Sequence, residues 1–157
     1  MIYRYAVRLE TEADEVGLIF PDFPEIVSWH PAGSSEAALK EAAADALLVA
    51  LHARVMENDD IPEPSEVVDA AFHVHARPLA VMKLALYEGL REEGLTRREL
   101  AKRLGKSDTI ANRLLDLTHK STVSQLEEAM SALGRDLVID ATATPKSPSD
   151  GQAPQHL

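Results

Sequence analysis

The sequence contains no cysteine in its 157 residues, which excludes both a disulfide framework and a thiolate metal site. It also lacks a long apolar run. The most apolar stretch, residues 42–51, is interrupted by Asp45 and is far shorter than the roughly 18 to 20 residues that cross a bilayer. From position 2 the N-terminus alternates between apolar and polar residues, a pattern that differs from a signal peptide. We therefore expect a cytoplasmic protein without a membrane segment.

A phosphate-binding loop is also missing, although the triplet Gly105-Lys106-Ser107 occurs in such loops. In a phosphate loop another glycine stands five positions before the glycine of the triplet, because the backbone must curl around the phosphates. The residue at that position is Leu100. The triplet instead suits a bend between two helices, and we expect no cofactor and no metal.

Charge is divided unevenly along the chain. The formal net charge is −10, and residues 1–78 contain 5 Lys or Arg and 15 Asp or Glu. Residues 79–144 are neutral, with 10 of each kind, but residues 95–120 within them contain 7 basic and 3 acidic side chains. An acidic half is therefore joined to a half with a basic centre. Only the basic centre suits a polyanion such as DNA.

The first half of the chain predicts an α+β unit. Period-two alternation predicts a strand at 2–9, and β-branched or aromatic runs predict two more at 16–20 and 26–29. Leucines and alanines at spacings of three and four predict a helix from 36 to about 57, and alternation returns at 68–76, starting from Val68. The predicted order is βββαβ, an antiparallel sheet with one covering helix.

The second half predicts four helices between Pro78 and Gly134. Their ends are marked by Gly94 and Gly105, and their starts by the capping-box pairs Thr96 with Glu99 and Thr122 with Gln125. The last helix is expected to bury Val123, Leu126, Met130 and Leu133.

An isolated strand is predicted at 136–142, and it needs a partner that a second subunit can supply. Residues 143–157 are rich in proline, serine and polar residues, so we expect a disordered tail. The predicted domains are an α+β domain at 1–76, an all-α domain with a C-terminal strand at 77–142, and the tail.

Residues 97–116 have the spacing of a helix-turn-helix. Ala101 is small where the helices cross, and Gly105 permits the tight turn. The segment resembles the Cro-like (XRE) repressor family, in which the helix after the glycine enters the major groove. Plain helical domains also contain glycine turns and solvated basic residues. Agreement between the cap, the alanine, the glycine and the local charge favours DNA binding.

Under this resemblance, Asn112 and Arg113 are the strongest candidates for reading bases, because asparagine can bond adenine and arginine guanine bidentately. Lys106 departs from the family, which usually has an apolar residue there, and Ile110 falls where burial is not required. The full set of candidate DNA-binding residues is Arg97, Lys102, Lys106, Ser107, Asp108, Thr109, Asn112, Arg113, His119 and Lys120. Of these, Arg97, Lys102, His119 and Lys120 are expected to hold phosphates.

The first half adds a second resemblance, carried by "EVGLIFPDFPEIVSWHPAGSSEAALKEAAADAL" and the later "IPEPS". These stretches resemble the HicB antitoxin family: a strand pair, a proline-rich turn, a strand, a serine-led helix and a Pro-Ser segment. With the helix-turn-helix, the resemblance covers nearly residues 1–142. It implies a type II antitoxin with a partial RNase H-like N-terminal domain. The resemblance also implies that the protein binds a HicA-like mRNA-cleaving toxin and represses its own operon. We expect it to bind the operator as a homodimer or homotetramer.

A toxin that cleaves RNA should be basic, so an acidic domain can cover its surface and compete with RNA. The candidate toxin-binding residues lie in turns and at a strand end: Asp22, Glu25, Trp29, His30, Asp59 and Asp60. Acidic loop residues are usually only solvated, and Trp29 is equally suited to core packing. Glu25 stands where the family turn usually has glycine.

Two other functions fit parts of the sequence. A solitary transcription regulator would use its first half to sense a ligand or another partner. A degenerate nuclease would need carboxylates clustered on the sheet to hold metal ions, whereas the acidic residues of the first half lie mostly in the turns and on the helix. We therefore expect no enzyme. His73 and His75 lack an evident third ligand and are interpreted as surface histidines.

Overall fold

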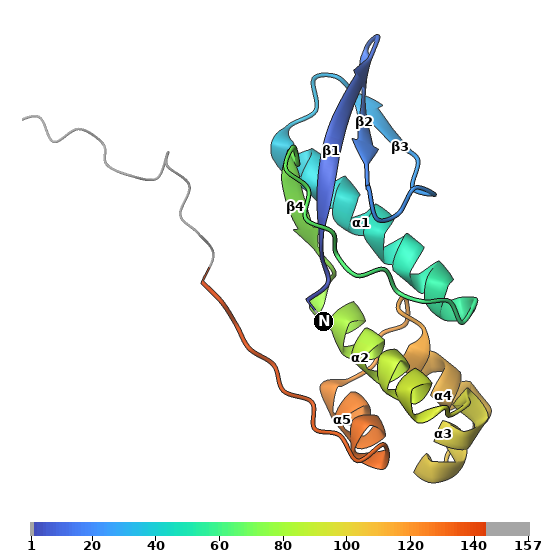
Figure 1. Cartoon of the computed structure of the whole chain (residues 1–157). Coiled ribbons are helices and arrows are strands. Elements are labelled where there is room, and N and C mark those ends of the chain that lie inside the picture. Colours follow the sequence, from blue (N-terminus) through green and yellow to red (C-terminus); the bar gives the residue numbers. More distant parts are fainter. Residues whose placement is uncertain (1, 144–157) are drawn as a thin grey trace, which may run out of the picture.

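The structure is a computed structural model that describes residues 2–143. Its elements are β1 (Arg4–Glu12), β2 (Glu15–Ile19), β3 (Ser28–Pro31), α1 (Glu36–Met56), β4 (Phe72–His75), α2 (Pro78–Glu93), α3 (Arg97–Leu104), α4 (Asp108–Leu115) and α5 (Val123–Ala132). The predicted α+β class and the order βββαβ followed by four helices are confirmed (Figure 1). Except for residue 143, the predicted disordered tail lies outside the described residues.

The four strands form one antiparallel sheet in the order β3-β2-β1-β4. The register places Tyr5 opposite Val74, and Leu9 opposite Leu18. Because side chains alternate between the faces of a strand, these apolar residues lie on one face. Helix α1 lies along the sheet (Figure 1) and completes the core with Leu39, Ala43, Leu47, Ala50, Leu51 and Val55.

Both ends of α1 follow from local sequence. The Ser35 hydroxyl accepts a hydrogen bond from the backbone N–H of Ala38 at 3.1 Å, so Ser35 is the N-cap. At the other end the chain turns at Asn58, whose φ is 58°, a left-handed conformation that asparagine tolerates better than most residues. Pro62 and Pro64 then prevent any return to helix.

The turn at 21–25 is fastened to the segment after α1. Phe23 is fully buried and meets the Tyr5 ring edge-on at 4.8 Å, while the Tyr5 hydroxyl donates to the carbonyl of Pro62 at 2.7 Å. The Asp22 carboxylate accepts from both the N–H and the hydroxyl of Ser65, at 3.0 and 2.5 Å. Positive φ angles at residues other than glycine occur, within 2–143, only at Ala13 and Asn58. Glu25 therefore does not need the backbone freedom of the glycine it replaces.

The predicted helix boundaries of the second half are confirmed. Both capping boxes, Thr96 with Glu99 and Thr122 with Gln125, are formed, and each typically stabilises a helix start by about 1 kcal/mol. Gly94 and Gly105 end α2 and α3 in the left-handed conformation. Glycine adopts this conformation without the steric penalty of a side chain.

Two details of the prediction were wrong, and a third, the strand at 136–142, concerns a pairing with a second copy and stays a prediction. Val68 is fully exposed in a loop and β4 starts only at Phe72, because β4 pairs with residues 4–7 of β1 alone. Val123 is 45% exposed instead of buried. Helical side chains tilt toward the N-terminus, so the first side chain of α5 lies beyond the edge of the core. Residues 136–142 form no strand in the single chain, where no partner strand is within reach.

The two halves of the chain share one continuous core. Tyr87 of α2 donates to the carbonyl of Asp59 at 2.5 Å, and Arg97 of α3 donates to the carbonyl of Val55 at 2.7 Å. At the other end of the contact, Arg77 bonds Glu41 and Asp45 of α1, at 2.8 and 2.6 Å. The sheet half is therefore packed directly on the helical half, with α1 and α2 in contact.

Candidate nucleic-acid interface

Helices α3 and α4 form a compact corner around two alanines. Ala101 is 2% exposed and Ala111 is completely buried, so the helices approach closely where they cross. Gly105 makes the turn with φ 63°, and the N–H of Lys106 donates to the carbonyl of Ala101 at 3.0 Å. The Ser107 hydroxyl then caps α4 by accepting from the N–H of Ile110. Two short helices joined by a glycine turn therefore lie where the spacing predicts them.

Most of the predicted DNA-binding side chains are exposed, and all of these but Lys120 belong to α3, α4 or the turn between them. The exposed ones are Lys102, Lys106, Ser107, Asp108, Thr109, Asn112, Arg113 and Lys120. Ile110 is also partly exposed, at 37%, so a thymine methyl could contact it. Lys106 lies 3.6 Å from Glu128 of α5; such an exposed pair is weak and is readily exchanged for another partner.

Two predicted phosphate-binding residues have contacts within the chain. The Arg97 guanidinium is bound to the end of α1 through the carbonyl of Val55 and is only partly exposed. The carbonyl of His119 accepts a hydrogen bond from the buried Lys83 at 2.6 Å, which fixes its backbone while its side chain stays partly exposed. The structure thus separates Arg97 from the remaining candidates, which surround α4.

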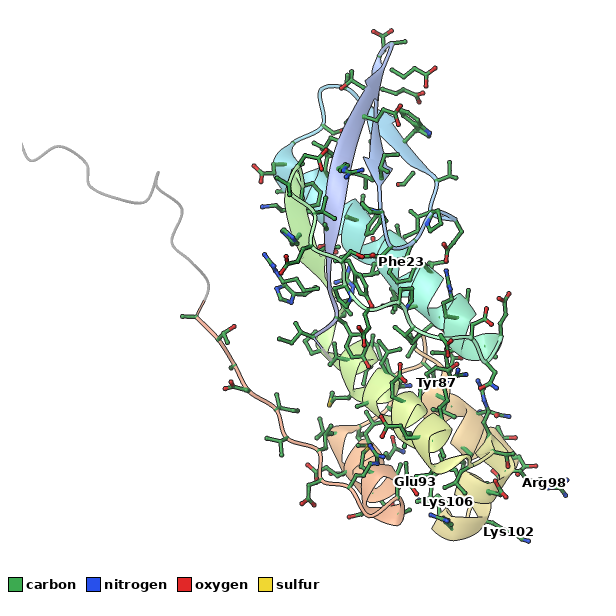
Figure 2. All side chains as sticks on the ribbon, viewed as in Figure 1. Phe23, Tyr87, Glu93, Arg98, Lys102 and Lys106 are labelled. Atoms are coloured by element: carbon green, nitrogen blue, oxygen red, sulfur yellow. The ribbon has the colours of Figure 1, made fainter. Side chains whose placement is uncertain are left out.

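Sequence reasoning missed Arg98, which lies one turn before Lys102 on the exposed side of α3. The two side chains line a shallow hollow together with Lys106, and all three project from the same end of the molecule (Figure 2). The signal was available in the sequence, because residues four apart on a helix share a face. Arg98 adds a positive charge beside the start of α4.

Sequence reasoning also missed Lys83, a polar residue on the buried side of α2. It is completely buried, and burial lowers its pKa to about 8, an effect that the negative charge of Asp116 opposes. Its ammonium donates to the carbonyls of Arg113, Asp116 and His119. It therefore contacts the backbone of the candidate interface from behind.

The acidic toxin-binding candidates lie around the C-terminal end of α1, and three of the four pair within the chain. Asp22 binds Ser65, Glu25 bonds the Arg54 guanidinium at 2.7 and 3.0 Å, and Asp60 forms an ion pair with Arg91. These carboxylates therefore have structural roles. Asp59 is exposed, and within 2–143 its carboxylate forms no hydrogen bond or ion pair.

Trp29 and His30 lie on β3, the edge strand. Trp29 pairs with Gly17 of β2, and its ring covers that glycine so closely that an added Cβ would lie 2.9 Å from the ring. Trp29 is therefore half-buried against the sheet. His30 shares a 2.7 Å hydrogen bond with Ser28. The six toxin-binding candidates do not form one cluster.

Two features are absent from the part of the chain that the structure describes. Residues 2–143 contain no group of three His, Cys, Asp or Glu side chains arranged to hold a metal ion. The described helices also include none with the length and apolar character needed to cross a membrane.

Comparison with known proteins relates nearly the whole chain to one family. No family model matches the chain. The chain is 30% identical over 146 residues to an antitoxin HicB of Pseudomonas fluorescens (strain Pf0-1), and the match covers 91% of this chain and 97% of that protein. It is 36% identical over 139 residues to antitoxin HicB of Escherichia coli (strain K12), covering 87% and 97%. A match to a methionyl-tRNA formyltransferase of Anaeromyxobacter sp. (strain K), 30% identical, spans 69% of this chain but only 36% of that enzyme.

The turn between α3 and α4 depends on glycine at position 105, where φ is +63°. We expect Gly105→Ala to lower the free energy of unfolding by about 1 kcal/mol, because a side chain is strained in this conformation. Gly33→Ala is the matched control, since Gly33 has open space around it and no positive φ. Urea denaturation measures both variants. Equal effects at the two positions would contradict the role assigned to Gly105.

Proposed function

The chain belongs to the HicB antitoxin family, and on that premise we propose that it binds and inhibits a HicA-like mRNA-cleaving toxin and binds operator DNA to repress its own operon. The family assigns the antitoxin role. The DNA half of the proposal is carried by one observation, the exposed residues of α4 beside the basic residues of α3. The proposal assigns no catalytic step to the chain.

The exposed side of α4 supports DNA binding through its chemistry. Asn112 and Arg113 are exposed and are of the two types that bond adenine and guanine bidentately in the major groove. Arg98 and Lys102 lie on the neighbouring helix, where positive charge can hold phosphates. The net charge of −10 does not oppose this, because most of the acidic side chains belong to residues 1–78.

We expect Arg113→Ala to weaken binding to DNA from upstream of the chain's own gene by roughly 1 to 3 kcal/mol and to relax selectivity at one base pair. Lys102→Ala should instead weaken binding to all sequences. It should also reduce the magnitude of the slope of log K against log salt concentration by about 1, because one phosphate contact is lost. Arg4→Ala is the control, because Arg4 is an exposed residue of the sheet. Fluorescence anisotropy at several salt concentrations measures all three. Unchanged affinity and selectivity of the Arg113 variant would contradict its assignment.

The acidic half supports toxin binding through charge. A nuclease that holds RNA needs positive charge at its binding surface, and residues 1–78 present three times as many acidic as basic side chains. Asp59 is the candidate that leaves the fold intact when changed, because its carboxylate has no partner among the described residues. Trp29 and His30 on the edge strand are proposed as a second contact.

We expect Asp59→Lys to slow association with the toxin by roughly three- to tenfold at low salt, because opposite charges steer encounter. The matched control is Glu127→Lys, the same reversal at an exposed position of α5. Surface plasmon resonance with the toxin encoded beside this chain measures both rates. Equal association rates for the two variants would remove Asp59 from the interface.

We also propose a homodimer or homotetramer that pairs the segment after α5. Arg135 anchors this segment to Glu92 of α2, and beyond it Val138 and Ile139 are 85% and 65% exposed. Apolar β-branched residues suit a strand, and a second copy would supply its partner. Two reading helices would then face half-sites about 34 Å apart or a multiple of that spacing.

Replacing both Val138 and Ile139 with serine should therefore convert the assembly to monomers, because the paired strands lose their apolar contact. Val68→Ser is the control, since Val68 is equally apolar and fully exposed in a loop. Light scattering gives the mass of each. A doubly substituted chain with the mass of the unmodified assembly would contradict this interface.

A further inference from the structure

Lys83 is the one polar or charged residue that is buried among residues 2–143. It projects from α2 between apolar neighbours, including Met82, Leu84 and Leu86. A buried ammonium is unfavourable unless each of its protons has a partner. A methionine at this position would fill similar space without a buried charge. The charge therefore has a local function.

All three ammonium protons have acceptors. Lys83 Nζ lies 2.8 Å from the carbonyl oxygen of Arg113, 2.7 Å from that of Asp116 and 2.6 Å from that of His119. Arg113 is in the last turn of α4, Asp116 is its C-cap, and His119 ends the following turn. One side chain thus joins three points of the backbone.

The end of α4 lacks the cap that its neighbours have. Helices α2 and α3 stop at left-handed glycines, whereas α4 stops at Asp116 with φ −79° and ψ 107°. The Arg113 carbonyl accepts one backbone bond, from the N–H of Asp116 at 3.3 Å, so it can accept a second, and a cation is favourable near the last carbonyls of a helix. Lys83 supplies both the donor and the charge.

The turn after α4 is also contacted from the sheet half. The Asp116 carboxylate accepts from the N–H and hydroxyl of Thr118, at 2.9 and 2.6 Å. It lies 3.5 Å from His52 Nδ1 of α1, an atom that is buried without a hydrogen-bond partner among the described residues. The turn is therefore contacted by α1 as well as by α2.

We propose that Lys83 is the positioning residue of the DNA-reading helix: its ammonium fixes the base-reading residue Arg113 relative to His119, which is assigned to a phosphate. Lys83 itself touches no DNA. The inference rests on the proposed function, because it assigns those roles to Arg113 and His119. It adds a residue of α2 that sets the geometry on which selective binding depends.

The absence of cysteine permits a test that changes one atom. The variant Lys83→Cys is unfolded, alkylated and refolded to give two products of equal length. An S-aminoethyl group restores an ammonium at the position of Nζ, and an S-propyl group replaces it with a methyl. Lys40→Cys, treated in the same two ways, is the control at an exposed lysine of α1.

Two measurements are compared, and the first needs no DNA. Amide hydrogen exchange at residues 116–120 should be roughly tenfold or more faster in the propyl product than in the aminoethyl product, with the sheet unchanged, because the charged hydrogen bonds are lost. The preference for DNA from upstream of its own gene over a random duplex should fall by a similar factor. Binding to the random duplex should change much less than the preference does, because no exposed charge is altered and the other phosphate contacts remain.

Each outcome decides a point. If the unmodified chain shows no preference for the upstream DNA, the proposed function fails. Amide hydrogen exchange at residues 116–120 then still tests whether Lys83 fixes the turn after α4. Equal exchange and equal preference in the two products overturn the positioning role. If neither product refolds, Lys83→Met expressed in cells is measured instead. Faster exchange throughout the sheet in that variant would also overturn the proposal, because Lys83 would then support the whole fold.

Discussion

The arrangement of the molecule depends on one continuous apolar core that runs from the sheet, across α1, into the helices α2 to α5. Apolar burial is the main force that stabilises folding, and here it is not interrupted where the acidic half ends. Tyr87, Arg91 and Arg97 reinforce the contact by donating to backbone carbonyls at 55–59. The sheet therefore holds a fixed orientation to α4. Under the proposed function, a toxin on the acidic half and DNA on the helical half would meet a single packed body, and each could influence the other without a flexible linker.

Charge serves the fold as well as the surface. Asp22, Glu25 and Asp60 resemble free recognition groups in the sequence, yet each holds a turn or loop to another part of the chain. Exposed ion pairs such as those of Glu25 and Asp60 contribute little stability one by one, but together with the Asp22–Ser65 hydrogen bonds they connect the loops around α1. Glu25 stands where the family turn usually has glycine. Its φ angle is not positive, so glycine is not required there, and its carboxylate binds Arg54. Lys83 is the opposite case, a charge removed from the surface to hold three carbonyls.

Local patterns predicted the elements well because their causes are local. The capping boxes at Thr96 and Thr122 and the glycine stops at Gly94 and Gly105 involve neighbouring residues only. The errors arose where a distant partner decides. Val68 lies outside the paired residues of β4, and Val123, at the start of α5, does not reach the core. The exposed candidates of α3 and α4 were found from helix-turn-helix spacing, whereas the contact of Arg97 with α1 could not be found from spacing.

The sequence by itself determined the α+β class, the helix ends, the crossing alanine with its glycine turn, and the resemblance to the antitoxin family, because periodicity, capping and motif spacing are properties of contiguous residues. The tertiary structure alone decided which charges are free. It paired Asp60 with Arg91, left Asp59 exposed, and buried Lys83 behind α4. These outcomes depend on atoms that are 30 or more residues apart in the chain, and a hydrogen bond over such a separation exists only once packing has brought its donor and acceptor together.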